Sequence, residues 1–148
     1  QTLSILNLKK IILETINEYK IKYKTKSDGF ISQWPNKFYL LGWYNRLLKH
    51  GYQQPHIHPA GWLSGCFYLK MPKPLKKSEG AINFSLHGYD YPIVNSDIPS
   101  YQYSPVEGDL ILFPSSLFHK TIPFSSNDER HVIAFDIIPE YGVVEYSE

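Results

Sequence analysis

The stretch QPHIHPAGWLSGCFYL, residues 54–69, decides how the rest of the sequence is interpreted. It places His56 and His58 one residue apart, directly before an apolar run that is typical of a buried strand. Side chains two residues apart in an extended chain lie on the same side. The two imidazoles are therefore expected to face the same way, as the first part of a metal site.

The third ligand of such a site must come from a distant strand, and His119 is the best-placed candidate. It lies in GDLILFPSSLFHKTIPF, residues 108–124, where an apolar strand ends at Pro114, a tight turn follows and the next strand opens with the histidine. Antiparallel neighbours can bring this side chain to the H-x-H pair. Three imidazoles suit zinc, copper, iron or nickel, so the ligand set alone leaves the metal open.

Composition and strand pattern predict a mainly β fold. The chain has 148 residues, 43% hydrophobic and 16% aromatic, which is enough for one domain with its own core. Short aromatic and β-branched runs alternate with Pro, Gly, Asn and Ser, as in a sandwich or barrel. The number of strands suits a jelly roll, the cupin-like double-stranded β-helix that holds a metal at one mouth. The strands are predicted at residues 38–44, 53–58, 63–70, 81–86, 101–104, 109–113, 118–123 and 131–138.

The region before these strands predicts one amphipathic helix, over residues 4–24. Leu8, Ile12 and Ile16 recur at helical spacing, with lysines and glutamates between them. This apolar stripe is expected to pack on the sheet. The chain is interpreted as a single domain over residues 1–148, with a jelly-roll core at about 38–139. Because the sequence begins with Gln1 rather than Met, it is open whether the chain is a fragment of a longer protein.

Charge and cysteine content restrict the expected partners and location. The formal net charge of +1 gives no strong field, so neither nucleic acid nor a membrane is expected as a partner. Cys66 is the single cysteine, which excludes a disulfide within the chain and a cysteine-rich zinc site. A cytoplasmic location is expected. The sequence predicts no particular oligomeric state.

Arg130 is conspicuous because Arg46 and Arg130 are the only arginines among 15 basic residues. It opens the last predicted strand, RHVIAFDIIP, in which alternation places Val132, Ala134 and Asp136 on the same face. A cation on this apolar face, turned inward, costs on the order of several kcal/mol unless an anion pairs with it. If Arg130 points inward, a carboxylate bound as a bidentate pair is expected. A position in water at the strand end is the alternative.

These motifs, in this order, resemble the 2-oxoglutarate/Fe(II)-dependent oxygenases, most closely their small prolyl-hydroxylase-like bacterial and phage members. The similar segments are PHIHPAGWLSGCFYL, GAINF, GDLILFPSSLFH and RHVIAF, within about residues 38–139. Each motif alone is weak, whereas the combination is specific. The resemblance implies that His56 is the first iron ligand and His119 the distal one. It also implies that Arg130 pairs with the far carboxylate of 2-oxoglutarate, to which Tyr68 donates a hydrogen bond.

One position departs from the family pattern. His58 falls where most members have Asp or Glu, so either it is a third, neutral ligand or iron is held by two histidines and water. Ligation by His58 is favoured. The resemblance implies a dioxygenase that uses Fe(II), 2-oxoglutarate and O2 to hydroxylate a substrate, with release of succinate and CO2. A peptide or amino-acid side chain is the favoured substrate, and a small molecule is the other candidate.

Two other classes of protein remain open. Residues 108–119 are close to the second cupin motif, but the glutamate that follows H-x-H in the first cupin motif is missing between Pro59 and Gly65. A cupin-like metal-binding protein or dioxygenase that does not use 2-oxoglutarate has no need of an inward Arg130. A non-catalytic binding module is the remaining class. Metal content separates this last class from the others, and succinate production from 2-oxoglutarate separates an oxygenase from a cupin.

Overall fold

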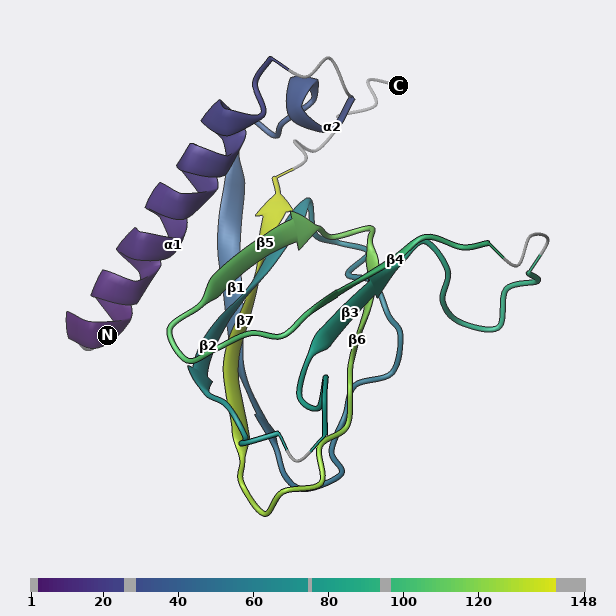
Figure 1. Cartoon of the computed structure of the whole chain (residues 1–148). Coiled ribbons are helices and arrows are strands. Elements are labelled where there is room, and N and C mark those ends of the chain that lie inside the picture. The colour runs from purple at the N-terminus through teal and green to yellow at the C-terminus, as the bar shows by residue number, and fades with distance from the viewer. Residues whose placement is uncertain (1–2, 26–28, 75, 94–96, 141–148) are drawn as a thin grey trace, which may run out of the picture. The chain divides into compact units, whose positions relative to one another are not determined.

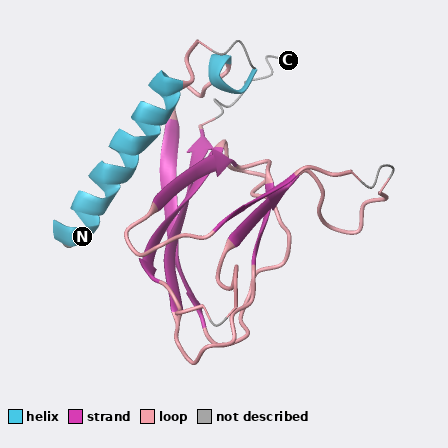
Figure 2. Cartoon of the chain, in the orientation of Figure 1, coloured by secondary structure: helices cyan, strands magenta, loops and turns pink. Residues whose placement is uncertain are grey.

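The structure is a computed structural model that describes residues 3–25, 29–74, 76–93 and 97–140. The chain divides into two compact units, Gln1–Asn36 and Lys37–Glu148. The first unit contains the helices and the second contains the strands (Figure 1, Figure 2). The interpretation of residues 1–148 as a single domain stays a prediction.

The predicted N-terminal helix is confirmed as α1 (Leu3–Lys22), and Ile12 and Ile16 are its buried residues. A second helix, α2 (Gly29–Ser32), was not predicted, because four residues are too few to show a helical period. It precedes Trp34, whose ring centroid lies 5.9 Å from that of Phe30. The packing of α1 on a sheet stays a prediction. Across the described residues, no helix is long and apolar enough to span a membrane.

The strands form two antiparallel sheets, which confirms the mainly β jelly-roll prediction (Figure 1). The larger sheet has the order β1-β7-β2-β5, and the smaller has the order β4-β3-β6. Apolar side chains from both sheets, including Ile82, Phe84 and Phe113, form a buried cluster. The strands are β1 (Phe38–Leu47), β2 (Leu63–Lys70), β3 (Ile82–Ser85), β4 (Ser100–Tyr103), β5 (Leu110–Pro114), β6 (Phe118–Thr121) and β7 (Arg130–Pro139).

β7 lies inside the larger sheet and turns two charged side chains toward the interior. It pairs with β1 on one side and with β2 on the other. Arg130 and Asp136 are only 3% and 5% exposed. The inward alternation predicted for this strand is therefore confirmed, and the alternative of Arg130 in water is wrong. The register with β2 places Ser64 opposite Asp136 and Tyr68 opposite Val132.

One predicted strand, residues 53–58, is wrong as a regular strand. The segment forms a single isolated bridge, between His56 and His119 on β6. A further bond joins Thr121 N–H to Gln53 O, at 3.1 Å. The step from Gln53 to His56 is three residues, whereas the facing step on β6 is two. An extra residue is therefore inserted beside β6, as in a β-bulge.

Pro55 is the physical reason for this interruption. It lies between the two bonded positions, and proline has no backbone N–H to donate to a sheet ladder. The segment continues the smaller sheet beside β6 only as an irregular, locally extended chain. The other predicted strands are confirmed, with ends that differ by at most three residues from those expected.

Candidate metal centre

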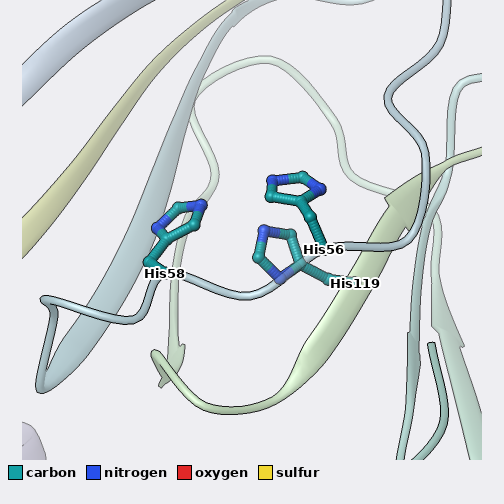
Figure 3. A group of neighbouring side chains, drawn as sticks. All are labelled: His56, His58 and His119. Atoms are coloured by element: carbon teal, nitrogen blue, oxygen red, sulfur yellow. The ribbon is translucent and has the colours of Figure 1, made fainter. Parts of the chain in front are cut away.

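Backbone hydrogen bonds hold the three predicted metal ligands on neighbouring segments. His56 and His119 exchange both of their main-chain bonds, each with an N–O distance of 3.0 Å. His58 N–H donates to Ser115 O, at 2.9 Å, in the turn between β5 and β6. β6 therefore anchors one end of the H-x-H pair and the turn anchors the other. The side chains converge even though His56 and His58 do not lie on a regular strand (Figure 3).

The three imidazoles lie close enough together to share one cation (Figure 3). One ring nitrogen from each residue lies within 4.8 Å of those from the other two. The ring centroids are 4.2 Å apart for His56 and His119, 5.0 Å for His58 and His119, and 5.3 Å for His56 and His58. His119 is buried and the other two are half-buried. The structure thus brings together all three residues that the sequence predicted as ligands.

A hydrogen bond at Nδ1 orients each imidazole. An acceptor at this atom fixes the proton there and leaves the lone pair of Nε2 for a cation. The site can therefore present three neutral Nε2 atoms, a donor set that fits Fe(II) and other first-row divalent ions. The acceptors are Gln54 O for His56 at 2.7 Å, Leu117 O for His119 at 3.0 Å, and Asp136 Oδ1 for His58 at 2.7 Å.

Burial keeps the His119 imidazole in the unprotonated form that can bind a metal. Removal from water lowers the pKa of His119 to about 4, and the hydrogen bond to Leu117 O opposes this effect only in part. An imidazole must be unprotonated to bind a metal. His119 is therefore neutral at physiological pH, even before any cation is present.

Asp136, Ser64 and Ser115 form a hydrogen-bonded group beside His58, and none of them is among the predicted ligands or co-substrate-binding residues. Asp136 Oδ1 accepts hydrogen bonds from His58 Nδ1 and from Ser64 Oγ, at 2.7 and 2.6 Å. Ser64 Oγ also lies 2.8 Å from Ser115 Oγ. The sequence could have indicated a buried Asp136, because alternation along β7 places it on the same inner face as Arg130. A buried carboxylate needs partners as much as a buried guanidinium does.

Arg130 and Tyr68 form a second polar group inside the jelly roll. The Arg130 guanidinium carbon lies 5.1 Å from the Tyr68 ring centroid, and both side chains are buried. Arg130 Nε donates to Gly80 O at 3.3 Å, and no carboxylate among the described residues pairs with it. Burial lowers the pKa of Arg130 and raises that of Tyr68.

The Tyr68 hydroxyl has no hydrogen-bond partner within the described part of the chain, although it is fully buried. A buried polar group of this kind ordinarily has a partner. A hydroxyl without a hydrogen-bond partner, beside a guanidinium without a carboxylate partner, fits an anionic ligand with carboxylate oxygens. The predicted position of 2-oxoglutarate is therefore consistent with the residues that are present.

The fold and the three-histidine cluster define a protein of the double-stranded β-helix class with a candidate metal site. Residues 42–136, well over half of the chain, match the family described as "Putative 2OG-Fe(II) oxygenase". The chain belongs to this family, as its sequence motifs predicted. The cofactors of the family are Fe(II) and 2-oxoglutarate.

Solved structures of low sequence identity share this fold. A Pseudomonas putida prolyl-4-hydroxylase aligns at 15% identity over 68% of this chain and 53% of its own, with a TM-score of 0.52. A 2OG-Fe(II) oxygenase family oxidoreductase from Burkholderia pseudomallei aligns at 17% identity over 72% and 47%, with a TM-score of 0.55. HygX from Streptomyces hygroscopicus, solved with nickel and 2-oxoglutarate bound, aligns at 15% identity over 70% and 59%, with a TM-score of 0.53. The chain spans about half the length of these proteins. No curated protein matches the sequence.

Substitutions of His58 test whether it binds the metal. His58→Ala should weaken metal binding by about tenfold or more, equivalent to at least ~1.4 kcal/mol, because one of three ligands is lost. His58→Asp should bind Fe(II) at least as tightly as the wild type, because an anionic oxygen restores the usual ligand set. Anaerobic competition with a chelator measures both affinities. An unchanged affinity in His58→Ala would show that two histidines suffice.

Tyr68→Phe tests the unpaired hydroxyl separately from the fold. The variant should bind 2-oxoglutarate roughly fivefold more weakly, since one hydrogen bond contributes about 1 kcal/mol net. The free energy of unfolding without ligand should not fall, because the hydroxyl has no partner to lose among the described residues. Calorimetric titration and denaturant unfolding measure the two quantities. A loss of stability with unchanged affinity would assign the hydroxyl a structural role instead.

Proposed function

We propose that this protein is an Fe(II)- and 2-oxoglutarate-dependent oxygenase that hydroxylates its substrate and releases succinate and CO2. The observation that carries the proposal is the buried Arg130, which has no carboxylate partner among the described residues. A buried cation without an anion is unfavourable, and a bound dicarboxylic acid supplies that anion. A cupin-like metal protein that does not use 2-oxoglutarate has no need of such a residue.

In this proposal His56, His58 and His119 hold Fe(II) through their Nε2 atoms. Bound Fe(II) supplies the redox chemistry, in which O2 and 2-oxoglutarate yield a hydroxylated substrate, succinate and CO2. Three neutral ligands leave the site one charge more positive than two histidines and a carboxylate do.

Arg130 and Tyr68 bind the far carboxylate of 2-oxoglutarate in the proposed enzyme. The guanidinium donates two parallel hydrogen bonds, which set the direction of the co-substrate as well as its affinity. The Tyr68 hydroxyl donates a third. The Phe113 and Phe84 rings lie 4.7 and 6.3 Å from that of His119 and contribute to the burial of this histidine.

We further propose a peptide or an amino-acid side chain as the substrate, with a small molecule as the other candidate. The resemblance of the sequence to prolyl-hydroxylase-like oxygenases supports the first of these. A cytoplasmic location, and the lack of nucleic-acid and membrane partners, stay predictions from the single cysteine and the near-zero net charge.

The test is the production of succinate by the purified protein. Protein loaded anaerobically with Fe(II) is mixed with 2-oxoglutarate and air-saturated buffer, with and without a panel of peptides and amino acids. Succinate should form above the level of a metal-free control, and the correct substrate should increase it. Metal binding without succinate from any mixture would favour a cupin-like protein. Failure to bind metal at all would favour a non-catalytic binding module.

A further inference from the structure

A carboxylate lies directly behind one of the three histidines. Asp136 is 5% exposed, and its Oδ1 atom accepts hydrogen bonds from His58 and Ser64. Ser64 and Ser115 are fully buried, with their hydroxyl oxygens 2.8 Å apart. Each hydroxyl has one proton to donate. The bonds therefore run in one direction, from Ser115 to Ser64 and from Ser64 to Asp136.

Close packing keeps this carboxylate in place. A side chain at Gly61 would come within 2.5 Å of Ser115 Oγ and 3.3 Å of Asp136 Cγ, so the loop before β2 needs glycine here. The β2–β7 register sets Ser64 opposite Asp136 inside the larger sheet. Asp136 consequently has little freedom to move, and the His58 ring is held by a group that is itself fixed.

His58 differs from the other two histidines in the charge of its partner. His56 and His119 hydrogen-bond to neutral main-chain carbonyls, whereas His58 bonds to a carboxylate. A carboxylate behind a ligating imidazole fixes the orientation of the ring and raises its basicity. His58 also occupies the position at which the H-x-D/E pattern has an acidic ligand. The H-x-D/E pattern has its negative charge at position 58 itself. In this protein Asp136 places a negative charge one hydrogen bond away from that position.

We propose that Asp136 is a positioning residue that orients His58 toward the metal and supplies the negative charge that three neutral ligands lack. Ser64 supports it by fixing the carboxylate oxygen that His58 contacts. This inference rests on the proposed function, since it requires that the three histidines bind a metal. It concerns metal affinity rather than turnover, so it can be tested without the substrate.

The test measures Co(II) affinity of the full chain by anaerobic competition with a chelator. Asp136→Asn keeps an acceptor for His58 but removes the charge, and it should weaken Co(II) binding by about tenfold. Asp136→Ala removes both and should weaken it by about a hundredfold, the upper end of the range for partners of ligating histidines. The visible spectrum of bound Co(II) should also shift in both variants, because the hydrogen bond that orients one ligand changes.

Glu129→Gln is the matched control. Glu129 Oε2 lies 2.6 Å from His131 Nε2, so this change breaks a carboxylate–histidine pair of the same kind outside the three-histidine cluster. Its Co(II) affinity and spectrum should equal those of the wild type. Circular dichroism of the metal-free proteins checks that each variant folds. If Asp136→Ala does not fold, the Co(II) affinity of Asp136→Asn alone tests the inference.

The same Asp136 substitution made in a His58→Asp variant shows whether Asp136 acts through His58. In a His58→Asp protein there is no imidazole to orient, so adding Asp136→Asn should weaken Co(II) binding far less than tenfold. An equal loss in both backgrounds, or wild-type affinity in folded Asp136→Asn, would overturn the inference while leaving the proposed function intact. If the wild-type protein itself binds no Co(II), the inference and the proposed function both fail.

Discussion

Alanine in place of either His56 or His119 should abolish metal binding. The wild-type protein is expected to hold one Fe(II), or a surrogate such as Mn(II), Co(II), Ni(II) or Zn(II), per chain. Each substitution removes one of three ring nitrogens that lie within 4.8 Å of one another. His119 is the more severe loss, because it is the buried ligand and is already neutral at physiological pH. Elemental analysis after anaerobic loading and desalting measures the occupancy.

His131→Ala is the matched control for these two substitutions. His131 is a half-buried histidine on β7 that bonds to Glu129 and to the Tyr44 hydroxyl, away from the three-histidine cluster. This variant should retain the metal content of the wild type. Full occupancy in both His56→Ala and His119→Ala would place the metal elsewhere and remove the basis of the oxygenase proposal.

Most of the jelly roll could be predicted from the sequence because its strands are short and clearly bounded. The run from Leu63 to Lys70 is flanked by turn-forming residues, and its predicted bounds equal those of β2. β7 was predicted to within one residue at each end for the same reason. Alternation also placed Arg130 and Asp136 on the inner face, which their burial confirms.

The features that the sequence did not reveal depend on contacts between distant segments. Residues 53–58 have the apolar and polar alternation of a strand, but Pro55 removes a donor that a regular ladder needs. The partnership of His58 with Asp136 joins residues 78 positions apart. A strand pattern shows only that Asp136 points inward, and the register between β2 and β7 determines what it meets there. The convergence of His56 and His58 could be predicted because the bulge lies before His56 and leaves the two side chains on the same side of the chain.

Arg130→Ala should raise the dissociation constant for 2-oxoglutarate by at least tenfold. The buried guanidinium can form two charge-assisted hydrogen bonds with a carboxylate, each contributing about 1.5–3 kcal/mol. Loss of only one of them at the lower limit, ~1.5 kcal/mol, already corresponds to roughly tenfold weaker binding, and loss of both to roughly a hundredfold. Metal content should stay near that of the wild type, because Arg130 is not one of the clustered ligands. Titration of 2-oxoglutarate into anaerobic Fe(II)-loaded protein, followed by the charge-transfer band or by calorimetry, measures the change.

Three further variants distinguish a bidentate guanidinium–carboxylate contact from an effect of positive charge alone and from an effect on folding. Arg130→Lys should recover only part of the affinity, since an ammonium cannot donate two parallel bonds to one carboxylate. Arg46→Ala removes the other arginine, which is exposed and paired with Glu129, and should bind 2-oxoglutarate normally. Arg130→Met should unfold no more easily than the wild type without ligand, because a buried cation that lacks an anion does not stabilise the protein. If Arg130→Ala binds 2-oxoglutarate as tightly as the wild type, the co-substrate does not pair with this residue, and a cupin-like metal protein becomes the better account of the site.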